Sequence, residues 1–301
     1  MTLDQLRIFV AVAEREHMTR AALSLHATQS AVSAAIAALE IRHDVKLFHR
    51  VGRGIALTDA GRIFLIEART VLARATDAEN ALAEISGLGR GTLSIVASQT
   101  IAGYWLPAYL TRFNALYPAI AIDLAIANTG QAAQLVRDGP AELGFVEGEV
   151  DDGALARWNI VEDRMILVGS SPCDQDIGAA WIRNASWVLR EPGSGTRSTF
   201  ERVLREHQIA PEDLRAKLVM PSNEAVRTAV EAGAGVAVLS SLVVDPAISA
   251  GTLHALPFAL PRRWFYGLRH KERYRGKAAD RLLRLICADL ESPGIGHDDA
   301  L

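Results

Sequence analysis

The sequence has few cysteines, few aromatic residues and no long hydrophobic run. Only two of its 301 residues are cysteine, Cys173 and Cys287, and neither has a cysteine or histidine beside it at metal-ligand spacing. This spacing excludes a cysteine-based zinc site and argues against a disulfide framework. The longest nearly apolar run, residues 232–244, is interrupted by glycine and serine and is too short to cross a bilayer. The amino-terminal segment has an acid at position 4 and no cleavage site, so we expect a cytoplasmic protein without a membrane partner.

Charge of one sign is also lacking. The formal net charge is −3, with 22% charged and 50% hydrophobic residues, which is the balance of a soluble globular protein. This total neither requires nor excludes nucleic acid, because the charge that binds it can be local. A length of 301 residues predicts two or three domains.

The hydrophobic pattern changes once along the chain. Up to about residue 86 the apolar residues recur with helical period, and from residue 92 short β-type runs alternate with helices. Between them, "SGLGRGT" contains three glycines. We therefore expect a hinge at residues 87–91 between a helical head and a second part at residues 92–301.

The head has the pattern of a helix-turn-helix. Leu6 and Phe9, with Val10 and Ala13, mark one buried helical face. Thr19 is a candidate N-cap of a second, short helix, and Thr28 can cap a third. Two short helices joined by a tight turn and packed on a longer one predict this motif.

The stretch "HATQSAVSAAIAALE", residues 26–40, places polar groups on the first turn of an otherwise apolar helix. In a helix-turn-helix the second helix enters the major groove by its N-terminal end. Gln29 can pair with adenine, and Ser30 and Ser33 can bond to base edges or phosphates. The alternative is that Thr28 and Ser30 only cap the helix.

A hairpin and a long helix are expected next. Two short β-type runs flank "VGRG", and Arg50 and Arg53 would follow phosphates or enter a minor groove, or would simply be solvated at a hairpin tip. Thr58 then caps a linker helix over residues 58–86, whose apolar positions are spaced 4-3-4-3-4-3. This spacing predicts a dimer, although packing on the chain's own second domain is the alternative. The seam consists of Phe64, Ala68, Val71, Ala75, Ala78, Leu82 and Ile85.

These motifs resemble the winged helix-turn-helix of LysR-type transcriptional regulators. The landmarks are "TRAA", "TQSAVS", "ALE", "LFHR" and "LTDAG". The resemblance implies a DNA-binding domain at residues 1–60 whose contacts include Thr19 and Arg20, and a homodimer or homotetramer that activates or represses transcription with RNA polymerase as a further partner. Ala34 and Ala35 stand where family members often have a long polar or basic pair, so Gln29, the serines and DNA deformability would carry more of the recognition.

The second part alternates strands and helices, which predicts mostly parallel sheets covered by helices. We expect two α/β subdomains, residues 92–163 plus 269–301 and residues 164–268. By resemblance this is an effector domain like a periplasmic binding protein, so the fold class is α+β multidomain. Ligands of such folds bind at the carboxyl ends of strands and at helix N-termini.

Candidate effector-binding residues follow from those strand ends. Hydroxyls, free backbone N–H groups and Arg197 suit a small anion, although serine and threonine there can be simple N-caps and "PGSG" a simple turn. The candidates are Ser98, Gln99, Thr100, Asn128, Thr129, Glu147, Ser194, Gly195, Thr196 and Arg197. We expect no cofactor and no metal, since "GSGT" lacks the P-loop ending and the histidines lack ligand spacing.

The pattern therefore predicts a transcriptional regulator that binds double-stranded DNA and a small-molecule effector. A solute-binding protein without a regulatory role is the alternative, and acyl transfer centred on Ser194 is an enzymatic one; no spacing supports the latter. The stretches "ASQTIAGYWLPAYLTRFNALYP" and "LGFVEG" resemble the branch of the family concerned with sulfur assimilation. The effector could then be an oxyanion such as sulfite or sulfate, and equally a carboxylate.

Overall fold

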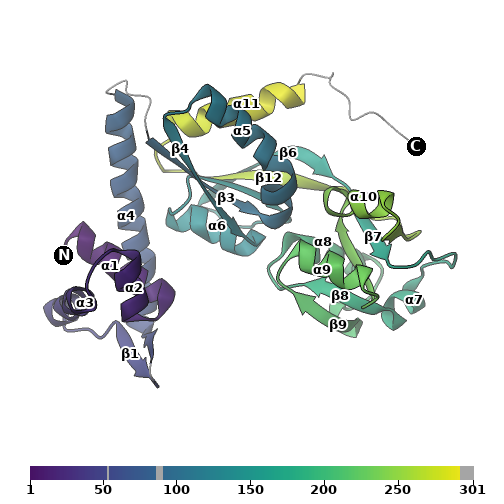
Figure 1. Cartoon of the computed structure of the whole chain (residues 1–301), viewed down its shortest axis with the longest axis horizontal. Coiled ribbons are helices and arrows are strands. Elements are labelled where there is room, and N and C mark those ends of the chain that lie inside the picture. Colours follow the sequence, from purple (N-terminus) through teal and green to yellow (C-terminus); the bar gives the residue numbers. More distant parts are fainter. Residues whose placement is uncertain (53, 86–90, 292–301) are drawn as a thin grey trace. The chain divides into compact units, whose positions relative to one another are not determined.

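The two parts of the sequence, with their different hydrophobic patterns, correspond to two units of the structure. A computed structural model describes residues 1–52, 54–85 and 91–291 (Figure 1). The first unit spans Met1–Ser86, and the second contains nearly all of the chain from Gly87 onward. Over the described residues no single helix is long and apolar enough to cross a membrane. One bent pair, Met18–Ser24 with Gln29–His43, meets that test by length and composition only.

Three helices begin the first unit: α1 (Leu3–Arg15), α2 (Met18–Ser24) and α3 (Gln29–His43). Thr28 caps α3, because its hydroxyl accepts from the backbone N–H of Ala31 at 3.2 Å. The cap predicted for α2 is wrong. That helix begins at Met18, and the ring Nδ1 of His17 accepts from the backbone N–H of Arg20 at 3.4 Å. A ring nitrogen thus supplies the acceptor two residues earlier, and Thr19 lies inside the first turn.

The predicted apolar faces of these helices form one core. Leu6, Phe9, Val32 and Leu39 are almost completely buried, and the ring of Phe9 lies 5.5 Å from that of Phe48, centroid to centroid. Burial of each such side chain stabilises the fold by about 1.5–3 kcal/mol. This core fixes the helix-turn-helix and holds the hairpin beside it.

The hairpin and the long helix complete the first unit. Strand β1 (Phe48–Val51) pairs antiparallel with β2 (Gly54–Leu57), and α4 (Asp59–Ile85) follows. Thr58 caps α4 as expected, since its hydroxyl accepts from the N–H of Gly61 at 3.0 Å. Gly61 is required there, because a Cβ would lie 2.2 Å from the carbonyl oxygen of Leu47. Arg53, at the predicted hairpin tip, lies outside the described residues.

The second unit contains two five-stranded sheets. The first has the order β4-β3-β5-β12-β6, with η1 (Ile101–Trp105), a π-helix, as well as α5 (Leu106–Leu116), α6 (Thr129–Asp138) and α11 (Lys277–Glu291). Its strands are β3 (Gly91–Ser98), β4 (Ile120–Ala127), β5 (Leu143–Glu147), β6 (Leu155–Asp163) and β12 (Arg263–His270).

The second sheet has the order β11-β7-β10-β8-β9. Its strands are β7 (Met165–Gly169), β8 (Ser186–Arg190), β9 (Arg215–Met220), β10 (Val236–Ser240) and β11 (His254–Ala255). The helices of this subdomain are α7 (Ala179–Asn184), α8 (Gly195–Glu206), η2 (Pro211–Asp213), α9 (Asn223–Glu231) and α10 (Ser241–Ser249). Large buried side chains such as Trp187 fill its core.

Two expectations about this unit need correction. The sheets are only half parallel, because β12 runs antiparallel to β5 and β6, and β7 runs antiparallel to β10 and β11. The second crossover precedes Arg263 instead of residue 269, since β12 belongs to the first sheet. Strand β6, which has no counterpart among the predicted strands, provides the first crossover. Both crossovers therefore pass the carboxyl ends of the parallel strands, and Arg263 lies opposite Asp163.

Candidate DNA-binding surface and effector site

The first turn of α3 presents polar side chains to solvent. Thr28, Gln29 and Ser30 are exposed, and Ser33 is half-buried. The hydroxyl of Thr28 caps the helix and lies 3.0 Å from that of Ser30, so these two groups are already engaged locally. Gln29 makes no side-chain hydrogen bond to any residue that the structure describes, and its amide is available to a base edge.

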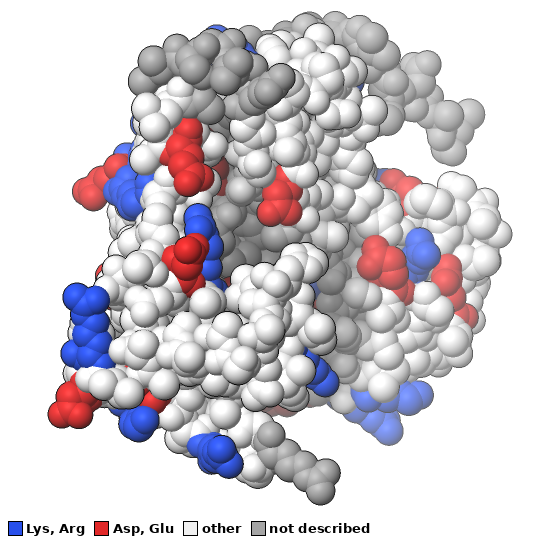
Figure 2. All heavy atoms as spheres, turned by 60° about the vertical axis from the view of Figure 1, so that its left-hand side comes forward, with Lys and Arg blue, Asp and Glu red and all other residues white. Residues whose placement is uncertain are grey.

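Two basic side chains that were predicted to contact DNA lie on the surface of the first unit. Arg20 on α2 and Arg50 on β1 are exposed, as is Thr19. On the face drawn in Figure 2, Lys and Arg side chains are interspersed with Asp and Glu across a mostly uncharged surface. A contact with the phosphate backbone would therefore depend on particular side chains and not on a field of one sign.

Glu40 attaches the hairpin to the end of α3. Its buried carboxylate accepts from Lys46 Nζ at 2.6 Å and from the backbone N–H groups of Leu47 and Phe48 at 2.9 and 3.3 Å. Burial alone would raise the pKa of Glu40, but these hydrogen bonds outweigh it and hold the pKa below its usual value. In the sequence Glu40 is only the last letter of the landmark "ALE", and its partners become visible only in the fold.

The predicted seam on α4 divides into two parts. Phe64 and Ala68 pack on the core of the first unit itself, so their apolar surface is used within the chain. Farther along, Val71 and Leu82 are 41% and 68% exposed, Ala78 is exposed and Ala75 is half-buried. The side chain of Ile85 lies outside the described residues. The seam available to a partner is therefore shorter than predicted.

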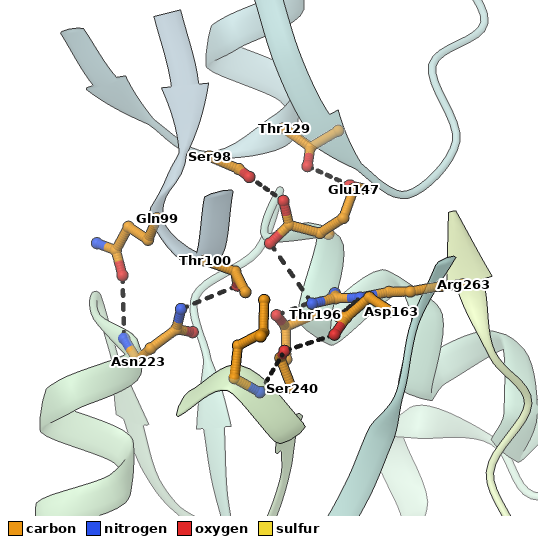
Figure 3. A network of polar contacts seen from close by, with 12 residues as sticks. Ser98, Gln99, Thr100, Thr129, Glu147, Asp163, Thr196, Asn223, Ser240 and Arg263 are labelled. Atoms are coloured by element: carbon orange, nitrogen blue, oxygen red, sulfur yellow. Dashed lines mark hydrogen bonds and ion pairs between the residues drawn. The ribbon is translucent and has the colours of Figure 1, made fainter. Parts of the chain in front are cut away.

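The predicted effector residues of the first sheet gather at its carboxyl edge (Figure 3). Ser98, at the end of β3, donates to the carboxylate of Glu147, at the end of β5, and Thr129 donates to the carbonyl oxygen of Glu147. Glu147 is 2% exposed, and burial raises the pKa of its carboxyl, although Arg263 and a hydrogen bond from Thr100 oppose the rise. The predicted anion site therefore already holds a carboxyl group of the chain.

Asn223 joins the two subdomains at the start of α9. Its backbone N–H donates to Gln99 Oε1 at 2.9 Å, and its side-chain amide donates to the hydroxyl of Thr100 at 3.1 Å. Its own Oδ1 accepts from Arg190, and the side chain is completely buried. A second bridge runs from the hydroxyl of Tyr104 to Glu224 at 3.0 Å.

Arg263 lies at the crossover and binds groups from both subdomains. Its Nε donates to Asp163 at 2.7 Å and its Nη1 to the hydroxyl of Thr196 at 3.2 Å. The remaining Nη2 lies 3.7 Å from Glu147 Oε1 and makes no hydrogen bond within the described structure. Ser240, at the end of β10, donates to Asp163 at 2.6 Å. The cluster is almost fully buried.

The "GSGT" loop meets the first sheet directly. A Cβ on Gly195 would lie 1.9 Å from the carbonyl oxygen of Glu147, so only glycine allows this approach. The backbone carbonyl of Gly193 accepts from Gly130 at 3.4 Å, beside Asn128, and Ser194 is buried next to Gly195.

One predicted effector-binding residue, Arg197, is bonded outside the polar cluster. Its guanidinium donates to Glu201 at 2.7 Å and to the carbonyl oxygen of Arg190 at 3.1 Å, on the side of α8. The arginines that do enter the region are Arg190 and Arg263. Neither was predicted from the sequence, and Asp163, Asn223 and Ser240 were missed as well. Within the described residues no group of histidine, cysteine and acidic side chains has the geometry of a metal site.

A winged helix-turn-helix and a two-subdomain α/β unit, with a polar cluster between its sheets, define a DNA-binding regulator with an effector domain. Two family models match this chain: the bacterial regulatory helix-turn-helix protein of the lysR family over residues 3–62, and the LysR substrate binding domain over residues 86–290. The chain therefore belongs to the LysR family of DNA-binding transcriptional regulators.

Individual relatives agree with this assignment. The HTH-type transcriptional regulator YeiE of Escherichia coli K12 is 32% identical over 94% of this chain and 96% of its own length. The regulator CbbR of Rhodospirillum rubrum is 32% identical over 89% and 90%. Among solved structures, CbnR, a LysR family transcriptional regulator, superposes with a TM-score of 0.68 at 22% identity, over 97% of this chain and 100% of that one. The regulatory domain of CcmR from Synechocystis, in complex with 2-PG, has a TM-score of 0.60 at 20% identity, over 68% of this chain and 99% of that one.

Proposed function

We propose that this regulator binds a two-fold DNA site through α3 and its wing. Gln29 would read a base edge, Ser30 and Ser33 would bond to bases or phosphates, and Arg50 would follow the backbone. Thr19, Arg20, Thr28 and Arg53 would add backbone contacts. The free amide of Gln29 on the leading turn of α3 supports this assignment, as does a solved structure of full-length CbnR with its target DNA, which shares the fold at a TM-score of 0.67 and 21% identity.

The DNA-binding form would be a homodimer or a tetramer. The exposed apolar positions of α4, namely Val71, Ala78 and Leu82, with Ala75 half-buried between them, give a strip suited to a second copy of the helix. A two-fold pair would present two copies of α3 to a palindromic site. Such a regulator would act in the cytoplasm, where the DNA is, with RNA polymerase as a further partner.

The effector would be a small anion bound between the subdomains. The observation that carries this proposal is that three helices begin beside the polar cluster between the sheets: α9 begins at Gln99 and Thr100, and α6 and α8 begin beside Asn128. Helix N-termini and unbonded backbone N–H groups favour negative charge. A sulfur oxyanion such as sulfite or sulfate, or a carboxylate, would satisfy them. The complex of CcmR with 2-PG shows that a protein of this fold takes a small molecule.

The effector would act by changing the closure of the subdomains. A ligand that binds the closed arrangement more tightly shifts the protein toward it, by no more than its difference in affinity. That shift would alter the placement of the DNA-binding pairs, activating a neighbouring operon or repressing the regulator's own gene. We propose no enzymatic activity: Ser194 is buried, and no histidine hydrogen-bonds to it among the described residues.

The test is a titration of the protein–DNA complex. The full chain is bound to labelled DNA from upstream of its own gene, and sulfite, sulfate and acetate are added separately at constant ionic strength. A saturable change in anisotropy with one of these anions, absent with chloride, is expected. A response only to a neutral or cationic metabolite would overturn the proposed effector class.

A further inference from the structure

The polar cluster between the sheets contains more negative than positive charge. Glu147 and Asp163 are almost fully buried with a single guanidinium, that of Arg263. Arg190, from β8, is the other cation close to Glu147, but it is paired with Glu191 at 2.8 and 3.0 Å. With every group ionised, the set of three carboxylates and two guanidinia carries one net negative charge.

The geometry identifies Glu147 as the group that is not compensated. Arg263 gives its Nε hydrogen bond to Asp163, and its Nη2 remains 3.7 Å from Glu147 without a hydrogen bond. Among the described residues, the carboxylate of Glu147 otherwise receives hydroxyl hydrogen bonds from Ser98 on β3 and Thr100 before η1, while Thr129 on α6 donates to its backbone carbonyl. A buried carboxylate is disfavoured relative to the neutral acid when its hydrogen bonds come from hydroxyls, one guanidinium lies 3.7 Å away without a hydrogen bond and the other is paired with Glu191.

An effector anion would add to this negative charge. Each helix N-terminus is equivalent to roughly half a positive charge, so α6, α8 and α9 together supply about 1.5 charges. If Glu147 is ionised, its own charge uses most of that potential. If Glu147 is protonated, the whole of this potential, about 1.5 charges, is available to a ligand, which balances one negative charge but not two.

We propose that the effector domain takes up its anion together with one proton, held on Glu147, and therefore selects singly charged anions over doubly charged ones. The inference rests on the proposed anionic effector and names its charge class. Glu147 would set the charge of the site by holding the proton, and it does not have to contact the anion.

The first experiment measures how many protons the protein takes up when an anion binds. Binding of acetate and of sulfate to the full-length protein is measured by calorimetry from about pH 5.5 to 8.5, in buffers of different ionisation enthalpy. We expect acetate to bind with net proton uptake and to lose up to about tenfold in affinity per pH unit at the alkaline end. Sulfate should bind at least about tenfold more weakly than acetate at neutral pH.

Two variants separate the possible outcomes. Glu147→Gln imitates the protonated acid, so its acetate binding should be independent of pH and stronger than that of the wild type at the alkaline end. Glu149→Gln removes the same charge from an exposed position two residues away and should retain the wild-type dependence. Acetate binding that is equally insensitive to pH in all three proteins, or sulfate preferred over acetate, would overturn the inference and leave an anionic effector standing. If no anion binds to the wild type or to Glu147→Gln at any pH, the proposed effector class itself is wrong.

Discussion

The side-chain amide of Asn223 donates to the hydroxyl of Thr100 at 3.1 Å, and this hydrogen bond joins the first turn of α9 in one subdomain to the start of η1 in the other. The backbone N–H of Asn223 also donates to Gln99, and its Oδ1 accepts from Arg190, so its backbone N–H and both ends of its side-chain amide have partners. A completely buried residue with partners in both subdomains fixes their relative arrangement more firmly than any one exposed contact would.

We predict that Asn223→Ala destabilises the effector domain by about 1–3 kcal/mol, because it removes one hydrogen bond each from Arg190 and Thr100 in a buried site. The measurement is the urea midpoint of the full chain. The matched control is Asn114→Ala on the exposed side of α5, which should change stability by less than about 0.5 kcal/mol. Equal effects of the two substitutions would contradict the bridging role.

The raised pKa of Glu147 predicts how stability depends on pH. Because burial raises this pKa above its usual 4.5, the stability that the neutral acid contributes is complete below 4.5 and is lost as pH rises through the folded-state pKa. The free energy of unfolding of the wild type should therefore fall over that range. Thermal melts of Glu147→Gln should show a flatter profile and a higher midpoint at neutral pH. An unchanged slope would mean that Glu147 does not hold the proton.

Gln29 is predicted to discriminate between bases. Gln29→Ala should cost about 1–3 kcal/mol on the preferred site at one base pair, with little change on unrelated DNA. Arg50→Ala is the contrasting variant, because a phosphate contact should weaken binding to all sequences alike and lower the salt slope by about 1. A uniform loss of affinity in Gln29→Ala would indicate that this side chain contacts only the backbone.

The free part of the α4 seam predicts the oligomeric state. Leu82→Glu should shift the protein toward monomer in sedimentation velocity, since it places a charge where two apolar strips would meet. Ile63→Glu is a close control, because Ile63 on the same helix is also 68% exposed but lies outside the seam. If neither variant dissociates, or if both do, dimerisation does not depend on these positions.

Local patterns in the sequence predicted the head well. The buried faces of α1 and α3, the caps Thr28 and Thr58 and the hairpin all depend on residues a few positions apart, which periodicity and capping preferences can detect. The cap of α2 was missed because His17, an uncommon acceptor, performs it. The inward use of Phe64 was missed because a heptad pattern does not state which protein supplies the partner.

The polar cluster between the two sheets could be predicted only in part. The strand-end rule located Ser98, Thr100, Thr129 and Glu147, which the structure brings together at one sheet edge. Asp163 and Arg263 meet across 100 residues because two crossover strands return past that edge, and no local pattern contains this pairing. The pairing of Arg197 could have been predicted, because Glu201 lies four residues later on the same helix, where it can pair with the arginine.

We expect α3 and the wing to read a specific DNA site. The most direct measurement is the fluorescence anisotropy of the purified full chain on labelled DNA from upstream of its own gene, with a scrambled duplex of equal length, at one near-physiological salt concentration. We predict at least a hundredfold preference for the native duplex, about 2.7 kcal/mol. Equally weak binding to both duplexes, with and without the anions tested above, would contradict it.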